Sequence, residues 1–242
     1  MIKKSAGILL FVLFLFMTLT AGTVSAFIDT DKTVYEEAVN LLEDLGIVTG
    51  MTSDYYMPGE KVTRAEAATI LARLTGMPFE GKKSDVFADV SAEHWANSAV
   101  TLCHELDIIH GMDETHFMPE DAVSLAQLAK MLVSFAGYVP AAEAAGGYPA
   151  GYLMKAAQLE ILSDTEGECT RGEMARMVYK TLFVPVFQPT AYGDDGGKYE
   201  AGKTVLEYYL HIQKKSGIVT ADNFNCMNGD AFAKPGEIHI DG

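Results

Sequence analysis

Apolar residues recur at steps of three and four along much of the chain, the spacing that places them on one face of an α-helix. The first such stretch covers residues 34–48, and Gly50 is expected to end this helix after Val48. Together the stretches predict an all-α domain over residues 27–187. The expected helices cover residues 34–48, 64–74, 95–109, 125–135, 152–161 and 171–182.

The helical pattern is repeated at an offset of 61 residues. Residues 38–41 (Ala-Val-Asn-Leu) return as residues 99–102 (Ala-Val-Thr-Leu), and a third, shorter copy follows. One helix–loop–helix unit cannot bury its own apolar face, so three copies are expected to pack against one another. The copies are assigned to residues 27–78, 79–139 and 140–187, with boundary linkers expected at 79–83 and 140–147.

Both ends of the chain differ from the repeats. Residues 1–26 combine two lysines, an apolar run and small residues before Ala26, which predicts a secretory signal peptide that is cleaved after Ala26. An uncleaved membrane anchor is the alternative, but the apolar run is short for a span. After the repeats we expect a linker (188–203) and an α+β tail (204–242), with a helix at 204–215 and strands at 217–220 and 237–240. The tail is either the truncated start of a β-rich domain or a short natural end.

The charge of the chain restricts its partners. Without the two lysines of the signal, 16 basic side chains face 33 acidic ones, a formal charge of −17. Such a surface excludes nucleic acid and anionic lipid as partners. The only cysteines are Cys103, Cys169 and Cys226. Because they follow no spacing motif, three unpaired thiols are favoured over a single disulfide.

A short polar segment opens the second helix of each copy. It reads Thr-Arg-Ala-Glu at 63–66, Ser-Leu-Ala-Gln at 124–127 and Thr-Arg-Gly-Glu at 170–173. All three fit the capping box, in which the first and fourth residues satisfy each other's main-chain amides. The box does not explain Arg64 and Arg171. A cation at the start of a helix faces the positive end of the helix dipole, which is unfavourable by about 0.3–1 kcal/mol. Either each arginine binds an anion from outside, or each is paired with a neighbouring acid of the protein.

Catalytic and metal-binding patterns are not found. Cys103 and His104 are adjacent in a predicted helix and therefore point to different faces. The histidines at 104, 110 and 116 lack a zinc spacing, and no loop has the twelve-residue calcium pattern. We expect no enzyme activity, no metal and no cofactor.

The repeats resemble the S-layer homology family. The resemblance rests on Phe27, Asp29, Tyr35, Gly50 and 63–66 in the first copy, on Phe87, Asp89, Trp95, Gly111, 117–119 and 124–127 in the second, and on a shortened third copy at 148–183. It implies a pseudo-threefold bundle that anchors an exported Gram-positive surface protein, without catalysis, at the cell wall or S-layer. The implied ligand is an acidic, often pyruvylated, secondary cell-wall polysaccharide, bound noncovalently in grooves between repeats.

The resemblance also implies the site residues. Arg64 and Arg171 would hold the acidic ketal, and the grooves would be lined by Asp29, Asp89 and Trp95 beside the box residues Thr63, Glu66, Thr170 and Glu173. Trp95 is alternatively a partly buried core residue. The departures at Leu125 and Gln127 imply a weak or empty middle groove. The competing functions are an N-terminal fragment of a surface enzyme, such as a wall or polysaccharide hydrolase, and an S-layer subunit that self-assembles.

Overall fold

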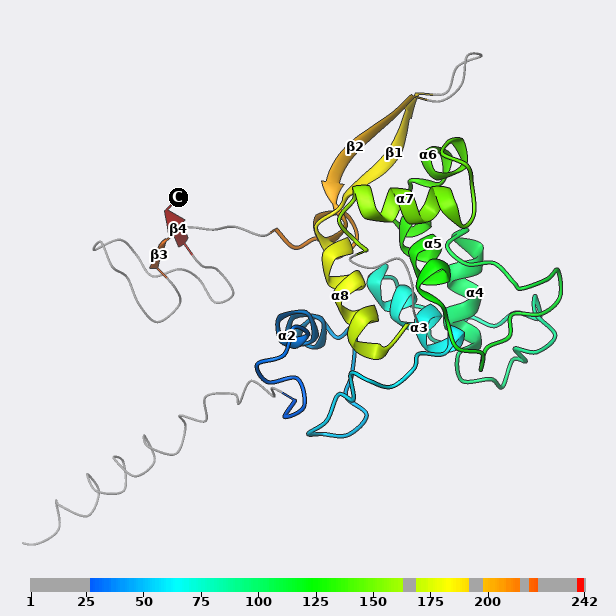
Figure 1. Ribbon diagram of the computed structural model, residues 1–242, viewed down its shortest axis with the longest axis horizontal. Helices are drawn as coiled ribbons and strands as arrows, with labels where there is room; N and C mark the ends of the chain where they lie inside the picture. Colours follow the sequence, from blue (N-terminus) through cyan, green and yellow to red (C-terminus); the bar gives the residue numbers. More distant parts are fainter. Residues whose placement is uncertain (1–26, 163–168, 192–197, 214–217, 222–238, 242) are drawn as a thin grey trace, which may run out of the picture.

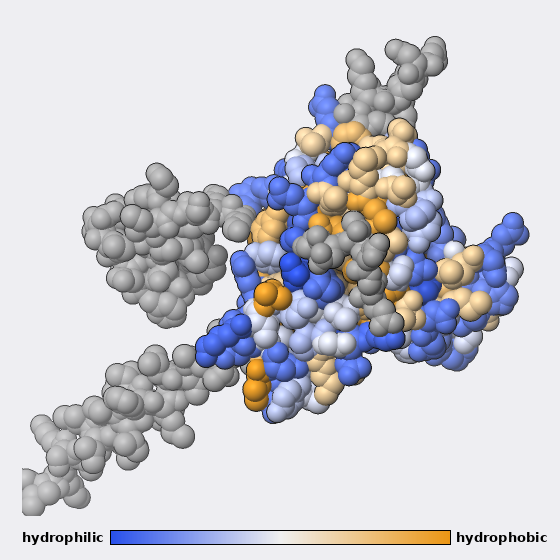
Figure 2. Space-filling model, viewed as in Figure 1, coloured by the Kyte–Doolittle hydropathy of each residue, from blue (hydrophilic) through white to orange (hydrophobic). Residues whose placement is uncertain are grey.

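The computed structural model describes residues 27–162, 169–191, 198–213, 218–221 and 239–241. The expected signal peptide, residues 1–26, lies outside them. The described part is mostly helical, as predicted, and no helix in it is both long and apolar enough to cross a membrane. Figure 2 shows a surface on which hydrophilic residues dominate and hydrophobic ones gather over α6 and α7.

Each of the six helices predicted for the repeats is present, and an additional short helix lies between the second and third copies (Figure 1). The additional helix, α6, lies in the stretch expected to be a linker; Pro140 is in its first turn, where no amide donor is needed. The helices are α2 (Glu36–Asp44), α3 (Arg64–Leu74), α4 (Asn97–Glu105), α5 (Leu125–Phe135), α6 (Val139–Ala144), α7 (Ala150–Gln158) and α8 (Arg171–Leu182).

The helices pair between repeats rather than within them. The second helix of each copy packs against the first helix of the next copy, so α3 pairs with α4, α5 with α7, and α8 with α2. The last pair joins the third copy to the first and closes the ring. Each repeat therefore completes the helix pair of its neighbour, which explains in physical terms why one copy is not enough.

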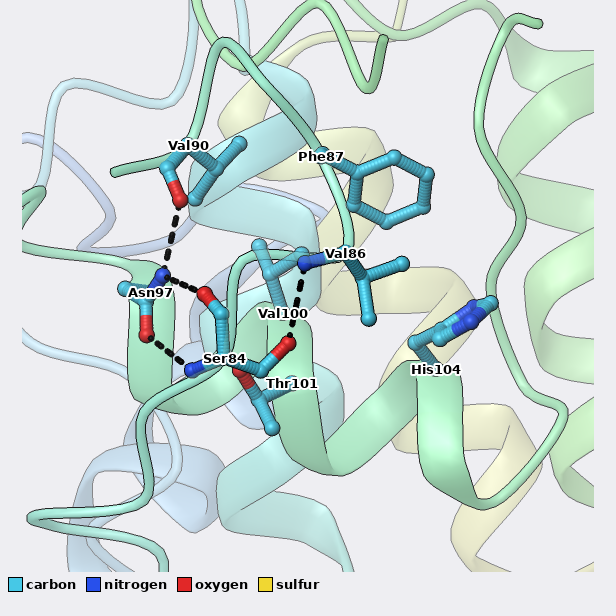
Figure 3. Close-up of a pocket in the computed structure, with 8 residues that line it drawn as sticks. All are labelled: Ser84, Val86, Phe87, Val90, Asn97, Val100, Thr101 and His104. Atoms are coloured by element: carbon cyan, nitrogen blue, oxygen red, sulfur yellow. Dashed lines mark hydrogen bonds between the residues drawn. The ribbon is translucent and has the colours of Figure 1, made fainter. Parts of the chain in front are cut away.

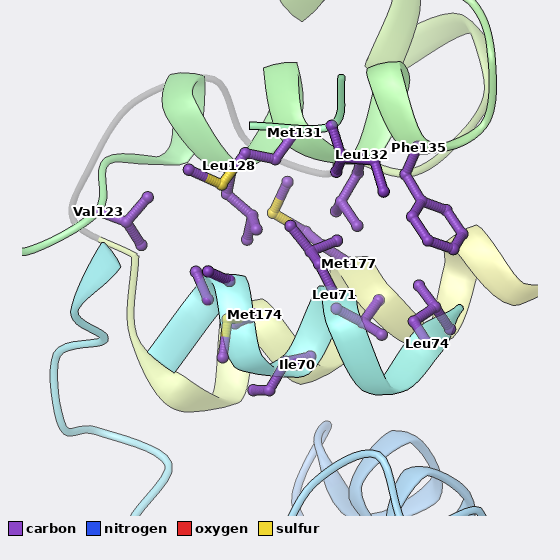
Figure 4. Close-up of a cluster of buried hydrophobic side chains, with 14 of the residues drawn as sticks. Ile70, Leu71, Leu74, Val123, Leu128, Met131, Leu132, Phe135, Met174 and Met177 are labelled. Carbon is purple, nitrogen blue, oxygen red and sulfur yellow. The ribbon is translucent and has the colours of Figure 1, made fainter. Parts of the chain in front are cut away.

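The core lies where the three second helices meet. Figure 4 shows side chains from α3, α5 and α8 directed into one cluster. Leu71 and Leu74 of α3, Leu128 and Leu132 of α5 and Met174 of α8 are almost completely buried. Burying one such side chain stabilises the fold by about 1.5–3 kcal/mol.

The first helices end earlier than expected because the turn is made by other residues. In the first copy α2 ends at Asp44, and Gly46, with φ of 68°, donates its amide to the carbonyl of Glu43 at 2.7 Å. Gly50, the expected stop, has another role. An added Cβ there would lie 2.3 Å from a ring atom of Phe27, so the aromatic ring requires a glycine at that position.

The segment expected to be a linker contains a hairpin that packs on the bundle. Strand β1 (Pro185–Ala191) pairs antiparallel with β2 (Lys198–Thr204), with Pro185 opposite Thr204, and α9 (Val205–Tyr208) follows. The linker was expected from glycine- and aspartate-rich residues, and those at 192–197 lie outside the described part. The helix expected at 204–215 is only the four residues of α9, capped by Thr204 and Glu207.

Two short strands near the end of the chain were predicted. Strand β3 (Ile218–Ala221) pairs antiparallel with β4 (His239–Asp241), and Ile218 lies opposite Asp241. The positions of the strands thus agree with the expectation for 217–220 and 237–240 to within a few residues.

Candidate functional site

Arg64 and Arg171 are buried at the interfaces between repeats. The Arg64 guanidinium donates from Nε to the carbonyl of Phe117 at 2.7 Å and from Nη2 to that of His110 at 3.0 Å. Arg171 donates in the same way, to the carbonyls of Tyr56 at 2.9 Å and Thr49 at 2.8 Å. Only 3% of Arg64 and 8% of Arg171 is exposed. Each arginine therefore fastens the second helix of one copy to the loop of another.

The partners of the two arginines are neutral. Within the described residues, neither guanidinium forms a salt bridge with a carboxylate. Burial lowers the pKa of Arg64 from its ordinary value, but a guanidinium stays charged in proteins. Both arginines thus have main-chain carbonyls, and no carboxylate, as their hydrogen-bond partners in the described part. The interpretation that each arginine is paired with an internal acid does not hold in the described part.

Each arginine borders a groove on the surface. The Arg64 groove has a volume of about 250 Å³, and the Arg171 groove about 190 Å³. The Arg64 groove is lined by Arg64, Ile108, Ile109, His110, Gly111, Met112, Gln127, Lys130, Met131 and Tyr148. The Arg171 groove is lined by Val48, Thr49, Gly50, Met51, Glu66, Thr69, Ile70, Arg73, Trp95 and Arg171.

The two grooves are copies of one another. Val48, Thr49, Gly50, Met51, Glu66, Thr69 and Ile70 correspond, at the offset of 61, to Ile109, His110, Gly111, Met112, Gln127, Lys130 and Met131. Each groove combines an arginine from the copy before, a glycine loop and helix from its own copy, and an exposed aromatic from the copy after. The aromatic is Trp95 in one groove and Tyr148 in the other, 60% and 48% exposed.

Trp95 lies in the groove predicted from the resemblance and is not a core residue. Its indole stacks on His94 with ring centroids 5.8 Å apart, and the residue is largely exposed. Tyr148 and Lys130 were not predicted. Tyr148 could have been found in the sequence, because it precedes its helix by two residues, as Trp95 does.

Asp29 and Asp89 hold loops and do not line either groove. The carboxylate of Asp29 accepts from the amides of Tyr56 and Met57, at 2.9 and 2.6 Å. Asp89 accepts likewise from Phe117 and Met118, at 2.9 and 2.7 Å. Both oxygens of each carboxylate are thus occupied, and these aspartates position the loop whose carbonyl receives the arginine.

The capping box is complete in two copies and half complete in the third. Thr63 and Glu66 satisfy each other's amides, as do Ser124 and Gln127. Thr170 accepts from the amide of Glu173 at 3.3 Å. The Glu173 carboxylate, however, accepts from the Tyr35 hydroxyl at 3.1 Å and pairs with Arg176. The expectation of three complete boxes is therefore wrong for the third copy, because other donors compete for Glu173.

Leu125 and Gln127 do not belong to the same groove. Gln127 lines the groove that contains Arg64, whereas Leu125 is a core residue, 5% exposed, that lines neither groove. At the third interface, Tyr35 covers the start of α8: an added Cβ at Gly172 would lie 2.9 Å from its ring. Both described grooves thus contain an arginine.

A further depression, at the start of the second copy, has essentially no free volume. Figure 3 shows the Asn97 side chain in its lining, donating to the carbonyls of Ser84 and Val90 at 2.9 and 2.8 Å. It is a packed joint and not a binding site. Within the described residues, no group of three or more His, Cys, Asp or Glu side chains is arranged to hold a metal ion.

Comparison with known proteins agrees with this architecture. The S-layer homology domain model matches residues 26–68 and 86–129. This chain contains two S-layer homology domains. The matches cover the first two copies, and α7 and α8 occupy the corresponding places of a third in the ring.

Three relatives illustrate the range of the family. The Middle cell wall protein of Brevibacillus brevis is 29% identical over 199 residues, which are 79% of this chain and 18% of that protein. The Surface layer protein of Brevibacillus choshinensis is 26% identical over 183 residues, 73% of this chain and 16% of its own length. The Cellulosome-anchoring protein of Acetivibrio thermocellus is 31% identical over 96 residues, 38% of this chain and 22% of its own.

This S-layer homology chain spans only 16–22% of the length of these three relatives. Two of the three names refer to the cell wall or the surface layer, and the N-terminal signal predicts that this chain is exported. The comparisons identify no catalytic domain in it.

Proposed function

We propose that this chain holds an exported protein at the cell wall by binding an acidic, pyruvylated secondary polysaccharide noncovalently and without catalysis. The observation that carries the proposal is the duplicated groove, in which an arginine, a glycine loop and an exposed aromatic recur at the same places. The volumes of about 250 and 190 Å³ lie below those of pockets for drug-sized ligands, about 300–1,000 Å³. They suit single sugar units of a polymer that runs along the surface.

The chemistry of the groove fits such a ligand. A guanidinium with two carbonyl partners can still bind a carboxylate, and Trp95 or Tyr148 offers a flat apolar face to a sugar ring. Long-range attraction does not contribute, because the chain as a whole is acidic and repels a polyanion. Binding therefore depends on the local contacts in the grooves.

A sedimentation experiment tests the proposal. Residues 27–242 should co-sediment with purified wall sacculi and remain in solution once the secondary polymer has been removed chemically. Trp95→Ala and Tyr148→Ala should each reduce the bound fraction. The matched control is Val34→Ala, since Val34 corresponds to Trp95 at the offset of 61, is 72% exposed and lines neither groove. Undiminished binding to polymer-free sacculi would refute the proposal.

Self-assembly is a second candidate, favoured by the relatives that are named as surface-layer proteins. It predicts concentration-dependent light scattering by residues 27–242 in the absence of any glycan. A monomer at all concentrations would exclude self-assembly through this part of the chain.

A further inference from the structure

The two grooves differ in charge at two corresponding places. Glu66 in the Arg171 groove is replaced by the neutral Gln127 in the Arg64 groove. Thr69 is replaced by Lys130. The lining of the Arg64 groove thus has two cations, Arg64 and Lys130, and no carboxylate. The Arg171 groove has two cations, since Arg73 lines it, and one carboxylate.

Lys130 is held at the mouth of its groove by aromatic rings. Its Nζ lies 5.4 Å from the centre of the Tyr148 ring and 5.7 Å from that of Tyr152. It forms no ion pair within the described residues. A cation that is positioned by ring faces keeps its hydrogen-bond donors for a ligand. Lys130 and Arg64 together can therefore bind one carboxylate from two sides.

The carboxylate of the other groove is fixed in place. Glu66 accepts from the amide of Thr63 at 2.8 Å and so cannot move away from a ligand. Arg73 is partly occupied, because it donates to the carbonyl of Ile47 at 3.2 Å. Gln127 accepts from the amide of Ser124 in the same way, but it brings no charge, and its Nε2 lies 3.6 Å from the sulfur of Met112.

From this difference we infer that the two grooves bind different parts of the polymer. The Arg64 groove binds the acidic unit between Arg64, Lys130 and the Gln127 amide. The Arg171 groove binds an uncharged sugar that stacks on Trp95, because Glu66 repels a second carboxylate there. The inference rests on the proposed function, and it reverses the expectation that the change to Gln127 weakens its groove.

Exchanging the corresponding residues tests the inference. Lys130→Thr and Gln127→Glu give the Arg64 groove the residues that the Arg171 groove has at these two places. Thr69→Lys and Glu66→Gln give the Arg171 groove the residues of the Arg64 groove. Glutamate and glutamine both complete the capping box in this chain, so the folded state is preserved; thermal unfolding by circular dichroism checks this. Affinity is measured with residues 27–242 for the native wall polysaccharide and for the same polymer with its carboxylates reduced to alcohols.

Lys130→Thr and Gln127→Glu should each weaken binding of the native polymer by about tenfold, the effect of one charge-assisted hydrogen bond. They should leave binding of the reduced polymer unchanged, whereas Trp95→Ala should weaken both alike. Equal losses for the two polymers in the Lys130 and Gln127 variants would overturn the division between grooves. A larger loss of native-polymer binding from Glu66→Gln than from Gln127→Glu would also overturn it. Failure of the unaltered chain to bind either polymer would instead refute the proposed function itself.

Discussion

The guanidinium carbon of Arg64 lies 4.5 Å from the centre of the Phe117 ring, and its Nε donates to the carbonyl of the same residue at 2.7 Å. Arg171 and Tyr56 repeat this relationship with the same 4.5 Å separation. In both cases one residue of a neighbouring repeat supplies a ring face and an acceptor. The arginine that borders the groove is thus also part of the joint that closes the bundle.

Arg64→Ala should therefore destabilise the fold as well as alter binding. It removes two hydrogen bonds from a charged donor and the contact with the Phe117 ring, and we expect a loss of about 2–4 kcal/mol. Urea unfolding followed by circular dichroism measures it. Arg73→Ala serves as the control, since Arg73 makes one described hydrogen bond and should lose about 1 kcal/mol. Equal unfolding midpoints for Arg64→Ala and the unaltered chain would contradict the structural role.

The glycine of each groove loop is required by an aromatic ring behind it. An added Cβ at Gly111 would lie 2.7 Å from a ring atom of Phe87 and 2.3 Å from the carbonyl oxygen of Asp113. Gly111→Ala should lower the free energy of unfolding by about 1–3 kcal/mol, as overpacking does. Gly59→Ala is the matched control, because nothing lies within 4 Å of its added Cβ. A thermal melt in which both variants behave alike would show that the ring tolerates the methyl group.

Asp89 should make the stability of the second repeat depend on pH in the acidic range. Partial desolvation alone would raise its pKa, but the amides of Phe117 and Met118 donate to the carboxylate and hold its pKa below the ordinary value. A lowered folded-state pKa stabilises the fold fully above the unfolded value of about 3.9, and this contribution is lost as the pH falls through the folded value.

Asp89→Asn should accordingly be less stable than the unaltered chain at pH 7, and the difference should shrink between pH 4 and pH 2. Urea midpoints across that range measure it. A difference that stays constant with pH would show that the two hydrogen bonds do not depend on the charge.

The buried thiols should be inert. Cys103 and Cys169 are free and buried, and desolvation raises the pKa of each to about 12. Since the thiolate is the reactive form, neither should react with a thiol reagent in the folded protein, and both should react in urea. The measurement is made in a Cys226→Ser background, because Cys226 lies outside the described residues. Rapid labelling of the folded chain would indicate that the core opens readily.

The sequence predicted the repeated part of the fold more reliably than the remainder. A repeat allows its copies to be compared, so the helices and two of the three capping boxes could be assigned. The pairing of α8 with α2, by contrast, joins the ends of the repeat region and leaves no local pattern. The same limit applies to the site, because Arg64 and Lys130 line one groove although they belong to different copies.

The hairpin escaped prediction, and the helix predicted at 204–215 is shorter than expected, for a related reason. Their contacts are with the ends of α3 and α5, far away in the sequence. An added Cβ at Gly76 would lie 2.8 Å from the carbonyl oxygen of Tyr209, and one at Gly137 would lie 2.1 Å from that of Phe187. These glycines fit helix ends equally well, and their φ values of 65° and 85° require no further explanation. The sequence therefore gave no sign that another segment lies on them.

Because these segments pack so closely, residues 184–191 and 198–210 should unfold together with the bundle. Leu206 of α9 is 5% exposed, and Tyr138 of the bundle donates from its hydroxyl to the carbonyl of Pro185 at 2.9 Å. Leu206→Ala should lower the free energy of unfolding of the whole helical domain by about 2–4 kcal/mol in a single urea transition. Ile212→Ala, at a side chain 41% exposed, should change it by less than about 1 kcal/mol. If Leu206→Ala left the helical transition in place, the hairpin and α9 would be an independent unit, and the helical bundle would end before them.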